Sequence, residues 1–505
     1  MRKKNVIINV VLSLLLLFFN TICGFIIPRL IISTYGSNVN GLISSITQFL
    51  AFITLLEAGF GPVIKSILYK PIANKDKVSM AKILKASEKI FKIISYIFIA
   101  YIFFLCCIMP FVVIEEFDVW FTVSLIVIIA ISTFSEYYFG MTYRLFLQAE
   151  QKTYVVSCIQ IATLILNTLV IWGLVYFKAN VQVVKLASSL VFMLRPVLQN
   201  VYVKKKYRIN LKNFKDEYKI KQKWDGLAQH IAYVIHTNAD IAILTLYGNL
   251  TEVSVYFVYY MIIEGVKNVV KSFVRGIDAT FGDMIARGEK DNLNRSIKVY
   301  EGLYFTVATI VFSATLFLIV PFVKIYTKGV TDANYMRPVF AVLMVIAELI
   351  CIVRQPYNDL VKVSGHFKQT QIGAWFEAVS NIVISFVLVW RFGLVGVAIG
   401  TIFAMFIRTV EFVCYTSKHI LQRSVWQAFK GIGAIIIEII IISVIMNFVP
   451  KFEVYSYVTW TLEAILVAGI SSVVVVCINC FVHKDSFKMI IAKLKNVFIT
   501  RNNRL

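Results

Sequence analysis

Long apolar runs follow one another along almost the whole chain. Of its 505 residues, 59% are hydrophobic and 16% are charged, whereas soluble domains carry about 25% charged residues. A run of about 20 apolar residues is long enough to cross a membrane as a helix. The chain therefore predicts an all-α, polytopic membrane protein. Its spans, about fourteen in number, are expected over 6–33, 39–66, 92–113, 120–146, 154–177, 181–203, 227–247, 253–275, 299–320, 336–361, 371–390, 394–416, 430–449 and 457–481.

Most of the positive charge lies between the apolar runs. The net charge is +23, and with a cytoplasmic amino terminus the inner segments hold most of the lysines and arginines. The first outer loop instead carries Glu115, Glu116 and Asp118. This asymmetry follows the positive-inside rule and predicts that both termini are cytoplasmic. The basic charge is thus explained by topology, and we expect no nucleic-acid partner.

The residue types that perform catalysis or bind metals form no recognisable pattern. All eight cysteines lie in apolar segments, and Cys477-x-x-Cys480 has neither a second pair nor a nearby histidine. The five histidines show no metal-ligand spacing. The largest predicted outer loop, 322–335, is too short for a catalytic domain. We therefore expect no catalytic residues, no metal site and no cofactor, and a protein that is not an enzyme.

The predicted eighth span carries a row of charge on one face. Lys267, Lys271 and Arg275 fall at i, i+4 and i+8, and Glu264 and Asp278 share their stripe. Charge inside a membrane is costly unless it faces water, a partner helix or a ligand. The row therefore predicts a polar cavity that receives an anionic group. The alternative is an inner helix end whose long side chains reach the headgroups, which explains Arg275 better than Lys267.

Two parts of the chain echo each other at an offset of about 212 residues. The segment that ends at Gly36 resembles the one that ends at Gly248, and Asn167 resembles Asn381 at a similar offset. A duplication over six spans predicts two parallel six-helix lobes, related by an axis along the membrane normal. We expect an N-lobe over 1–203, a basic cytoplasmic linker over 204–226, a C-lobe over 227–420, and two extra helices with a basic cytoplasmic tail over 421–505.

Several short motifs occur in an order and spacing that together carry a family resemblance. They are Tyr35-Gly-Ser-Asn-Val-Asn-Gly41, Glu57-Ala-Gly-Phe-Gly61, Leu68-Tyr-Lys-Pro71, Asn238-Ala-Asp240 and Phe392-Gly-Leu-Val-Gly396. With these motifs the chain resembles the exporter superfamily of multidrug, oligosaccharidyl-lipid and polysaccharide transporters, especially its polysaccharide branch. The resemblance covers almost the whole chain. It implies two six-helix lobes around a central cavity that opens alternately to each side of the membrane.

The resemblance also implies a function and a location. The chain would be a flippase of the bacterial plasma membrane, moving an undecaprenyl-diphosphate-linked oligosaccharide from the inner to the outer leaflet for capsule or surface polysaccharide assembly. Its partners would be this glycolipid, membrane lipid and other polysaccharide-assembly proteins, and we expect a monomer. The alternative within the superfamily is an extruder of drugs or organic cations, whose cavity should be acidic or aromatic. A membrane polysaccharide polymerase or glycosyltransferase is less favoured, because it would need a larger outer loop.

Cations inside the predicted spans are the candidate contacts for a lipid diphosphate. Arginine suits phosphate because its planar fork binds two oxygens. The candidates are Arg29, Lys65, Arg195, Lys267, Lys271, Arg275 and Arg354. Each has an alternative: an ion pair for Arg29, and contact with the headgroups for Lys65. Arg195 precedes Pro196 directly and Arg354 lies two residues before Pro356, and either arginine could instead cap the carbonyl groups that the proline frees.

Acidic residues inside the predicted spans are candidates for ion coupling. A buried carboxyl can bind H⁺ or Na⁺ and release it as access switches. Three acids are considered for this role: Glu57, Asp240 and Glu264. The alternative is that they compensate the charge of Arg29 and Lys267. Glu438 and Glu463 are expected to hold the last two spans together.

Overall fold

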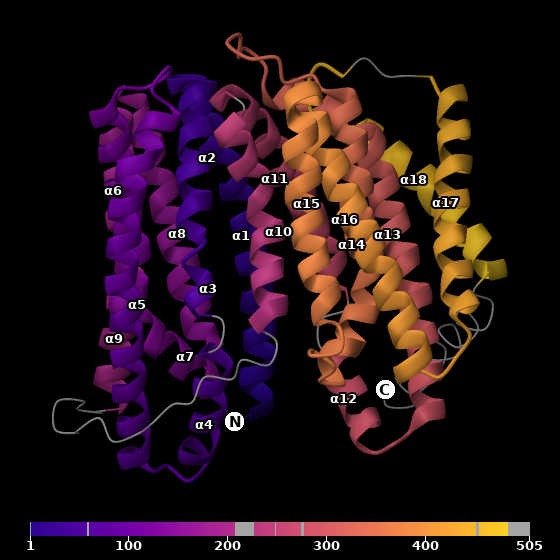
Figure 1. The fold of residues 1–505 in the computed structure, drawn as a ribbon, viewed down its shortest axis with the longest axis horizontal. Coiled ribbons are helices and arrows are strands. Elements are labelled where there is room, and N and C mark those ends of the chain that lie inside the picture. Colours follow the sequence, from indigo (N-terminus) through magenta and orange to yellow (C-terminus); the bar gives the residue numbers. More distant parts are fainter. Residues whose placement is uncertain are drawn as a thin grey trace, which may run out of the picture. The chain divides into compact units, whose positions relative to one another are not determined.

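The computed structural model describes residues 2–57, 60–207, 227–247, 249–273, 277–450 and 454–482. Within these ranges the chain forms helices and turns, and they contain no strand (Figure 1). Thirteen of the described helices are long and apolar enough to cross a membrane. The seventh predicted span coincides with a further helix, α10 (Leu227–Tyr247). The expected all-α membrane fold with about fourteen spanning helices is confirmed, as required of a chain whose backbone groups must be satisfied without water.

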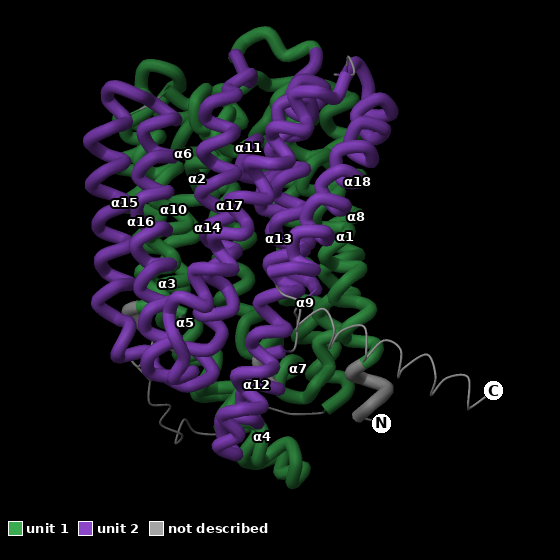
Figure 2. The backbone as a smooth tube through the Cα atoms, turned by 90° about the vertical axis from the view of Figure 1, so that its right-hand side faces the viewer, with its two compact units in different colours: residues 1–257, 329–333 green, residues 258–328, 334–505 purple. Residues whose placement is uncertain are grey.

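The chain divides into two compact units (Figure 2). Unit 1 comprises Met1–Phe257 and Gly329–Ala333, and unit 2 comprises Val258–Lys328 and Asn334–Leu505. The predicted lobe boundaries stay a prediction, because they were based on an internal sequence repeat, whereas the two units are defined by which residues pack together. Most of the predicted linker (208–226) and the tail (483–505) lie outside the described residues.

Unit 1 contains the first ten α-helices and one π-helix. Their bounds are α1 (Arg2–Tyr35), α2 (Ser37–Ala51), α3 (Thr54–Glu57), α4 (Gly61–Ala73), α5 (Lys77–Val112), α6 (Val119–Ser135), η1 (Glu136–Gly140), α7 (Met141–Ala149), α8 (Thr153–Tyr176), α9 (Val181–Tyr207) and α10. The first residues of α11 (Leu250–Ser272) also belong to unit 1.

Unit 2 contains the rest of α11 and the helices that follow it. They are α12 (Ile277–Ala286), α13 (Lys290–Tyr326), α14 (Pro338–Val363), α15 (Gln371–Phe392), α16 (Leu394–Tyr415), η2 (Thr416–Ile420), α17 (Val425–Phe448) and α18 (Tyr457–Val482). Two glycines let α15 and α16 approach closely. A Cβ on Gly400 would lie 2.2 Å from Ser385 Oγ, and one on Gly396 would lie 2.5 Å from the carbonyl oxygen of Leu388.

Two predicted spans are not single regular helices. The second, 39–66, is divided among α2, α3 and α4. Here the amide of Phe52 donates to the carbonyl of Phe49 at 3.1 Å, which makes a tighter turn than an α-helix. The fourth, 120–146, contains the π-helix η1 between α6 and α7. Sequence periodicity misses both features because each changes the helical path without changing its apolar character.

The first turn of α2 is hydrogen-bonded to the first turn of α11 inside unit 1. Asn40 Nδ2 donates to Ser254 Oγ at 2.8 Å, and Thr251 Oγ1 donates to Asn38 Oδ1. The partners are 214 and 213 residues apart, respectively, which is close to the offset of the predicted repeat. If the predicted repeat exists, these contacts join near-equivalent positions of its two copies; the repeat itself stays a prediction.

Gly36 gives a stability prediction at the start of α2. Its φ is +91°, and Asp332 accepts hydrogen bonds from the Ser37 amide (2.6 Å) and the Ser37 hydroxyl (2.8 Å). A Cβ on Gly36 would lie 2.9 Å from Asp332 Oδ2. We expect Gly36→Ala to destabilise the protein by about 1–3 kcal/mol, measured as a lower thermal unfolding midpoint in detergent. Gly173→Ala is the control, because a Cβ there meets no heavy atom within 4 Å; equal midpoints would contradict the prediction.

Candidate functional site

Unit 1 contains a partly open cavity of about 370 Å³ among its membrane-spanning helices, with hydroxyl groups and one charged side chain in a lining that is otherwise apolar. This is the size range of small-ligand sites. Residues of α2, α3, α6, η1 and α9 line it, together with the turn between α2 and α3. Seven lining residues carry hydroxyl groups: Thr47, Thr54, Ser132, Thr133, Tyr137, Ser188 and Ser189. Hydroxyls both donate and accept hydrogen bonds, so this lining suits an oxygen-rich ligand.

Lys185 of α9 is the charged residue in the cavity lining. Ser188, Ser189 and Phe192 follow it at i+3, i+4 and i+7, and therefore share its helical face. Within the described ranges no carboxylate pairs with the Lys185 ammonium group. The cavity therefore has a net positive lining. Such a lining can bind an anionic group, because a fixed charge interacts more strongly in a site of low dielectric.

Lys185 was not among the candidates from the sequence. It lies one turn inside the predicted span 181–203, where a lysine commonly reaches the headgroups. The signal that could have found it is the spacing of Ser188 and Ser189 on the same face, which makes an otherwise apolar helix locally polar.

The π-helix η1 forms part of the cavity wall and positions two of the acids near it. The Tyr137 hydroxyl donates to Glu57 Oε2 at 3.0 Å. Arg144 lies 3.6 Å from Glu57 Oε1 and 3.0 Å from Glu136 Oε1. A Cβ on Gly140 would lie 2.6 Å from the Cβ of Pro196, so only glycine allows η1 to pack on α9 here. The acids Glu57 and Glu136 are thus paired with Arg144, and neither lines the cavity.

Arg195 does not line the cavity but packs against Phe192, which does. Its Nε donates to Thr163 Oγ1 of α8 at 2.8 Å, and its guanidinium lies 4.1 Å from the centre of the Phe192 ring. This bond goes to a hydroxyl rather than to a carbonyl freed by Pro196. The side chain is therefore fixed between α8 and α9, and it supports Phe192 in the cavity wall.

The other predicted site residues of unit 1 do not line this cavity. Arg29 on α1 and Lys65 on α4 are half-buried. Asp240 on α10 is 5% exposed and accepts a hydrogen bond from the Tyr256 hydroxyl at 2.9 Å. Their roles in binding or coupling stay predictions.

In unit 2, Lys267 is held between two acids. Its Nζ lies 2.8 Å from Glu264 on its own helix and 2.8 Å from Glu348 on α14. Lys267 is 8% exposed, so this arrangement matches the charge compensation considered above. Lys271 is half-buried on α11, whereas Arg275 lies outside the described residues.

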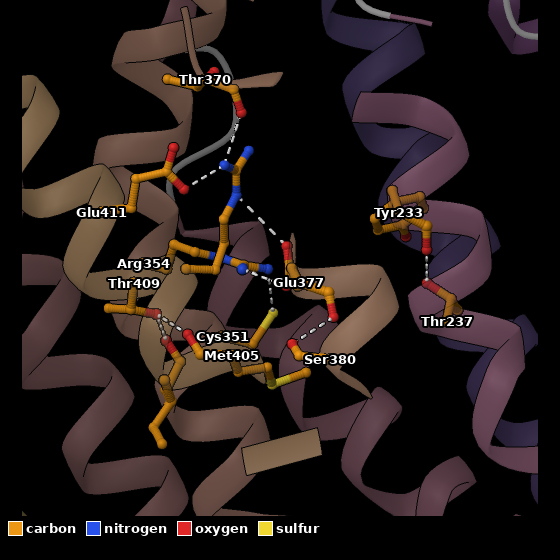
Figure 3. A network of polar contacts seen from close by, with 12 residues as sticks. Tyr233, Thr237, Cys351, Arg354, Thr370, Glu377, Ser380, Met405, Thr409 and Glu411 are labelled. Atoms are coloured by element: carbon orange, nitrogen blue, oxygen red, sulfur yellow. Dashed lines mark hydrogen bonds and ion pairs between the residues drawn. The ribbon is translucent and has the colours of Figure 1, made fainter. Parts of the chain in front are cut away.

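Arg354 belongs to a balanced network of two arginines and two glutamates (Figure 3). Its NH1 lies 2.6 Å from Glu377 Oε1, and Arg408 lies 3.5 Å from the other oxygen of Glu377. Arg408 also contacts Glu411 at 2.6 Å and donates to the carbonyl oxygen of Thr370 at 2.8 Å. The network joins α14, α15 and α16 without net charge. The network therefore stabilises the packing of these three helices, because each of its charges already has a partner of opposite sign.

Comparison with known proteins identifies the fold. No family model and no curated protein matches the sequence. The structure of a lipid II flippase, MurJ, in an inward closed conformation is similar with a TM-score of 0.65 and 15% identity, over 92% of this chain and 98% of that one. The structure of an inward-facing MATE family multidrug resistance transporter of the MOP superfamily has a TM-score of 0.61 and 13% identity, over 80% of this chain and 94% of that one. The structure of a MATE protein in the bent conformation has a TM-score of 0.52 and 14% identity, over 80% of this chain and 93% of that one.

These similarities concern the fold. The chain has the fold of the MOP-superfamily transporters, a group whose members here include a lipid flippase and multidrug transporters. The predicted superfamily fold is confirmed, and the polysaccharide branch stays a prediction. The three solved structures are those of a lipid flippase and of MATE transporters.

Proposed function

We propose that this protein is a flippase for a lipid-linked oligosaccharide, which it moves from the inner to the outer leaflet of a bacterial plasma membrane by alternating access. The product would serve capsule or surface polysaccharide assembly. The diphosphate would follow the cations predicted from the sequence, while the lipid tail remains in the hydrocarbon layer. No covalent bond is made or broken in this process.

The observation that carries the proposal is the Lys185 ammonium group in a hydroxyl-lined cavity. A site for organic cations would be expected to present carboxylates. Here the nearby acids Glu57 and Glu136 are paired with Arg144 and lie outside the lining. A sugar presents several hydroxyl groups. Four of the seven lining hydroxyls already donate to acceptors within the protein, and their oxygens can still accept hydrogen bonds from a sugar.

The extent of the similarity does not separate the two candidate functions, because it reflects the fold alone. The lipid II flippase structure covers 92% of this chain, whereas the two MATE structures cover 80%. An extruder of drugs or organic cations remains the competing function, because its fold is the same. The two functions differ in the charge of the substrate, so a transport assay separates them.

The test compares two substrates in vesicles that contain the purified full chain. We expect an undecaprenyl-diphosphate-linked oligosaccharide to become accessible to a glycosidase on the opposite side, with no transport of an organic cation such as a quaternary ammonium dye. The variant Lys267→Ala/Lys271→Ala/Arg275→Ala should leave the glycolipid on its original side at an equal amount of folded protein. If this variant flips the glycolipid at the normal rate, Lys267, Lys271 and Arg275 do not bind the diphosphate during transport. Dye transport without glycolipid flipping would overturn the proposed function.

A further inference from the structure

A fully buried carboxyl lies where α13, α17 and α18 pack against one another in unit 2. Glu438 of α17 has 0% of its surface exposed. Neither of its side-chain oxygens has a hydrogen-bond partner, and no cation pairs with it within the described part of the chain. The sequence-based expectation was that it links the last two spans, yet it makes no bond that would do so.

Three hydroxyl side chains on the neighbouring helices are buried as completely as Glu438. Thr309, Ser313 and Ser471 are each 0% exposed. The Thr309 hydroxyl lies beside the Glu438 carboxyl, but it donates its proton to the carbonyl oxygen of Phe305 at 2.8 Å. Ser313 Oγ and Ser471 Oγ have no hydrogen-bond partner. Four polar groups are therefore buried here with bonding capacity unused, which is rare and calls for a ligand or a proton.

The helix register places these groups at one level. Trp460 Nε1 of α18 donates to the carbonyl oxygen of Leu318 at 3.1 Å, and Val467 packs with Ala314. The two helices are therefore antiparallel, and Ser471, one turn beyond Val467, lies about one turn before Ala314, near Thr309 and Ser313.

The third helix, α17, places Glu438 at the same level as Thr309. Met446 of α17 packs against the cluster formed by Ala314, Leu318 and Val467. Glu438 precedes Met446 by about two turns on the same face. This places the carboxyl beside Thr309, in agreement with the contact between the two side chains.

Few titratable groups surround this position. On α13, Tyr304 and Glu301 lie within about two turns of Thr309, and Glu301 pairs with Arg423. On α18, Glu463 and Cys477 lie about two turns to either side of Ser471, and on α17 the exposed Lys430 lies about two turns before Glu438. The helices α16 and η2 also contact α17. Their titratable side chains are Arg408, Glu411, Cys414, Tyr415, Lys418 and His419, of which the first two pair with each other. None of these groups offers Glu438 a compensating charge.

A bare carboxylate in this place is strongly unfavourable, because a buried charge must be paired or neutralised. The carboxyl can be neutralised by a proton, or its charge can be balanced by a small cation. Carboxylate and hydroxyl oxygens are the hard ligands that alkali and alkaline-earth cations prefer. A monovalent cation matches the single negative charge.

We propose that Glu438, with the hydroxyls of Thr309, Ser313 and Ser471, forms a binding site for H⁺ or Na⁺ in the two C-terminal helices, and that its occupancy couples to substrate movement. The coupling half of this statement rests on the proposed function. The binding half does not.

The binding half is tested by infrared difference spectroscopy on the purified full chain in detergent. Changes of pH at constant Na⁺, and of Na⁺ at constant pH, should give a carboxylic-acid carbonyl band that is absent in Glu438→Gln. A band that responds to pH alone identifies H⁺, and one that Na⁺ removes identifies Na⁺. Ser313→Ala/Ser471→Ala should weaken the Na⁺ response and leave the pH response. Glu463→Gln is the matched control and should retain the band. Identical pH and Na⁺ responses of the wild type and Glu438→Gln would overturn the site.

The coupling half is tested by the ratio of glycolipid flipping with and without an imposed gradient. One pH unit biases the movement of one proton about tenfold, and a potential of about 100 mV biases one charge about fifty-fold. We expect stimulation in the wild type and in Glu463→Gln, and a ratio near one in Glu438→Gln. An undiminished ratio in Glu438→Gln would overturn the coupling. A wild type that flips no glycolipid would contradict the proposed function instead, while the infrared experiment would still decide the site.

Discussion

Replacing Lys185 by methionine is expected to slow glycolipid flipping by about 10- to 100-fold, because hydrogen bonds from a charged donor contribute about 1.5–3 kcal/mol. Methionine keeps the apolar stem and removes only the ammonium group. The loss should not come from unfolding, since the half-buried Lys185 ammonium group has no carboxylate partner within the described ranges whose pairing the substitution would break. The measurement is the initial flipping rate in vesicles at equal amounts of folded protein.

Two variants separate the charge of Lys185 from other effects. Lys185→Arg keeps the positive charge and should retain more activity than Lys185→Met. Lys70→Met removes an exposed lysine on α4 of the same unit, and it should flip at the wild-type rate. If Lys185→Met and Lys70→Met flip equally fast, the cavity of unit 1 does not bind the substrate.

Glu377→Gln is expected to destabilise the fold by about 3–5 kcal/mol, the usual effect of removing one partner from a buried ion pair. Glu377 is 8% exposed and lies between two arginines, at 2.6 Å from Arg354 and 3.5 Å from Arg408. The substitution leaves Arg354 without its carboxylate partner in a region with little access to water. The thermal unfolding midpoint of the full chain in detergent measures the effect.

The control for this prediction is an ion pair of similar length that is more exposed than the network. Glu88 lies 2.8 Å from Lys92, with side chains that are 24% and 33% exposed, and Glu88→Gln should cost about 1 kcal/mol or less. The double variant Glu377→Leu/Arg354→Met should recover much of the loss, because it removes both charges together. Equal midpoints for Glu377→Gln and Glu88→Gln would contradict a structural role for the network.

The sequence predicted most of the helical architecture. Each spanning segment must satisfy its backbone hydrogen bonds internally, so an apolar run of sufficient length is enough to identify a helix. This holds even for α10, which contains His230, His236 and Asp240. The break after Ala51 and the π-helix at Glu136–Gly140 were not predictable in this way, since both depend on local backbone bonding.

The candidate site was less predictable than the fold. Sequence position identified Lys267 and Arg354 as cations at membrane depth, but not Glu348 and Glu377 as their partners. These acids lie on other helices, and their distance from the cations depends on how the helices rotate and cross. Lys185 was not predicted as a site residue, because the cavity that it lines exists only through the packing of α2, α6 and α9.

The sequence by itself thus determined that the chain is a bundle of membrane helices and which charges lie inside the membrane. Helix formation in the membrane depends on local composition and length, which a sequence states directly. The tertiary structure decided which of those ionisable side chains have a charged partner and which, like Lys185 and Glu438, have none within the described part of the chain. That distinction depends on separations of a few ångströms between side chains from different helices, over which electrostatic energy changes steeply.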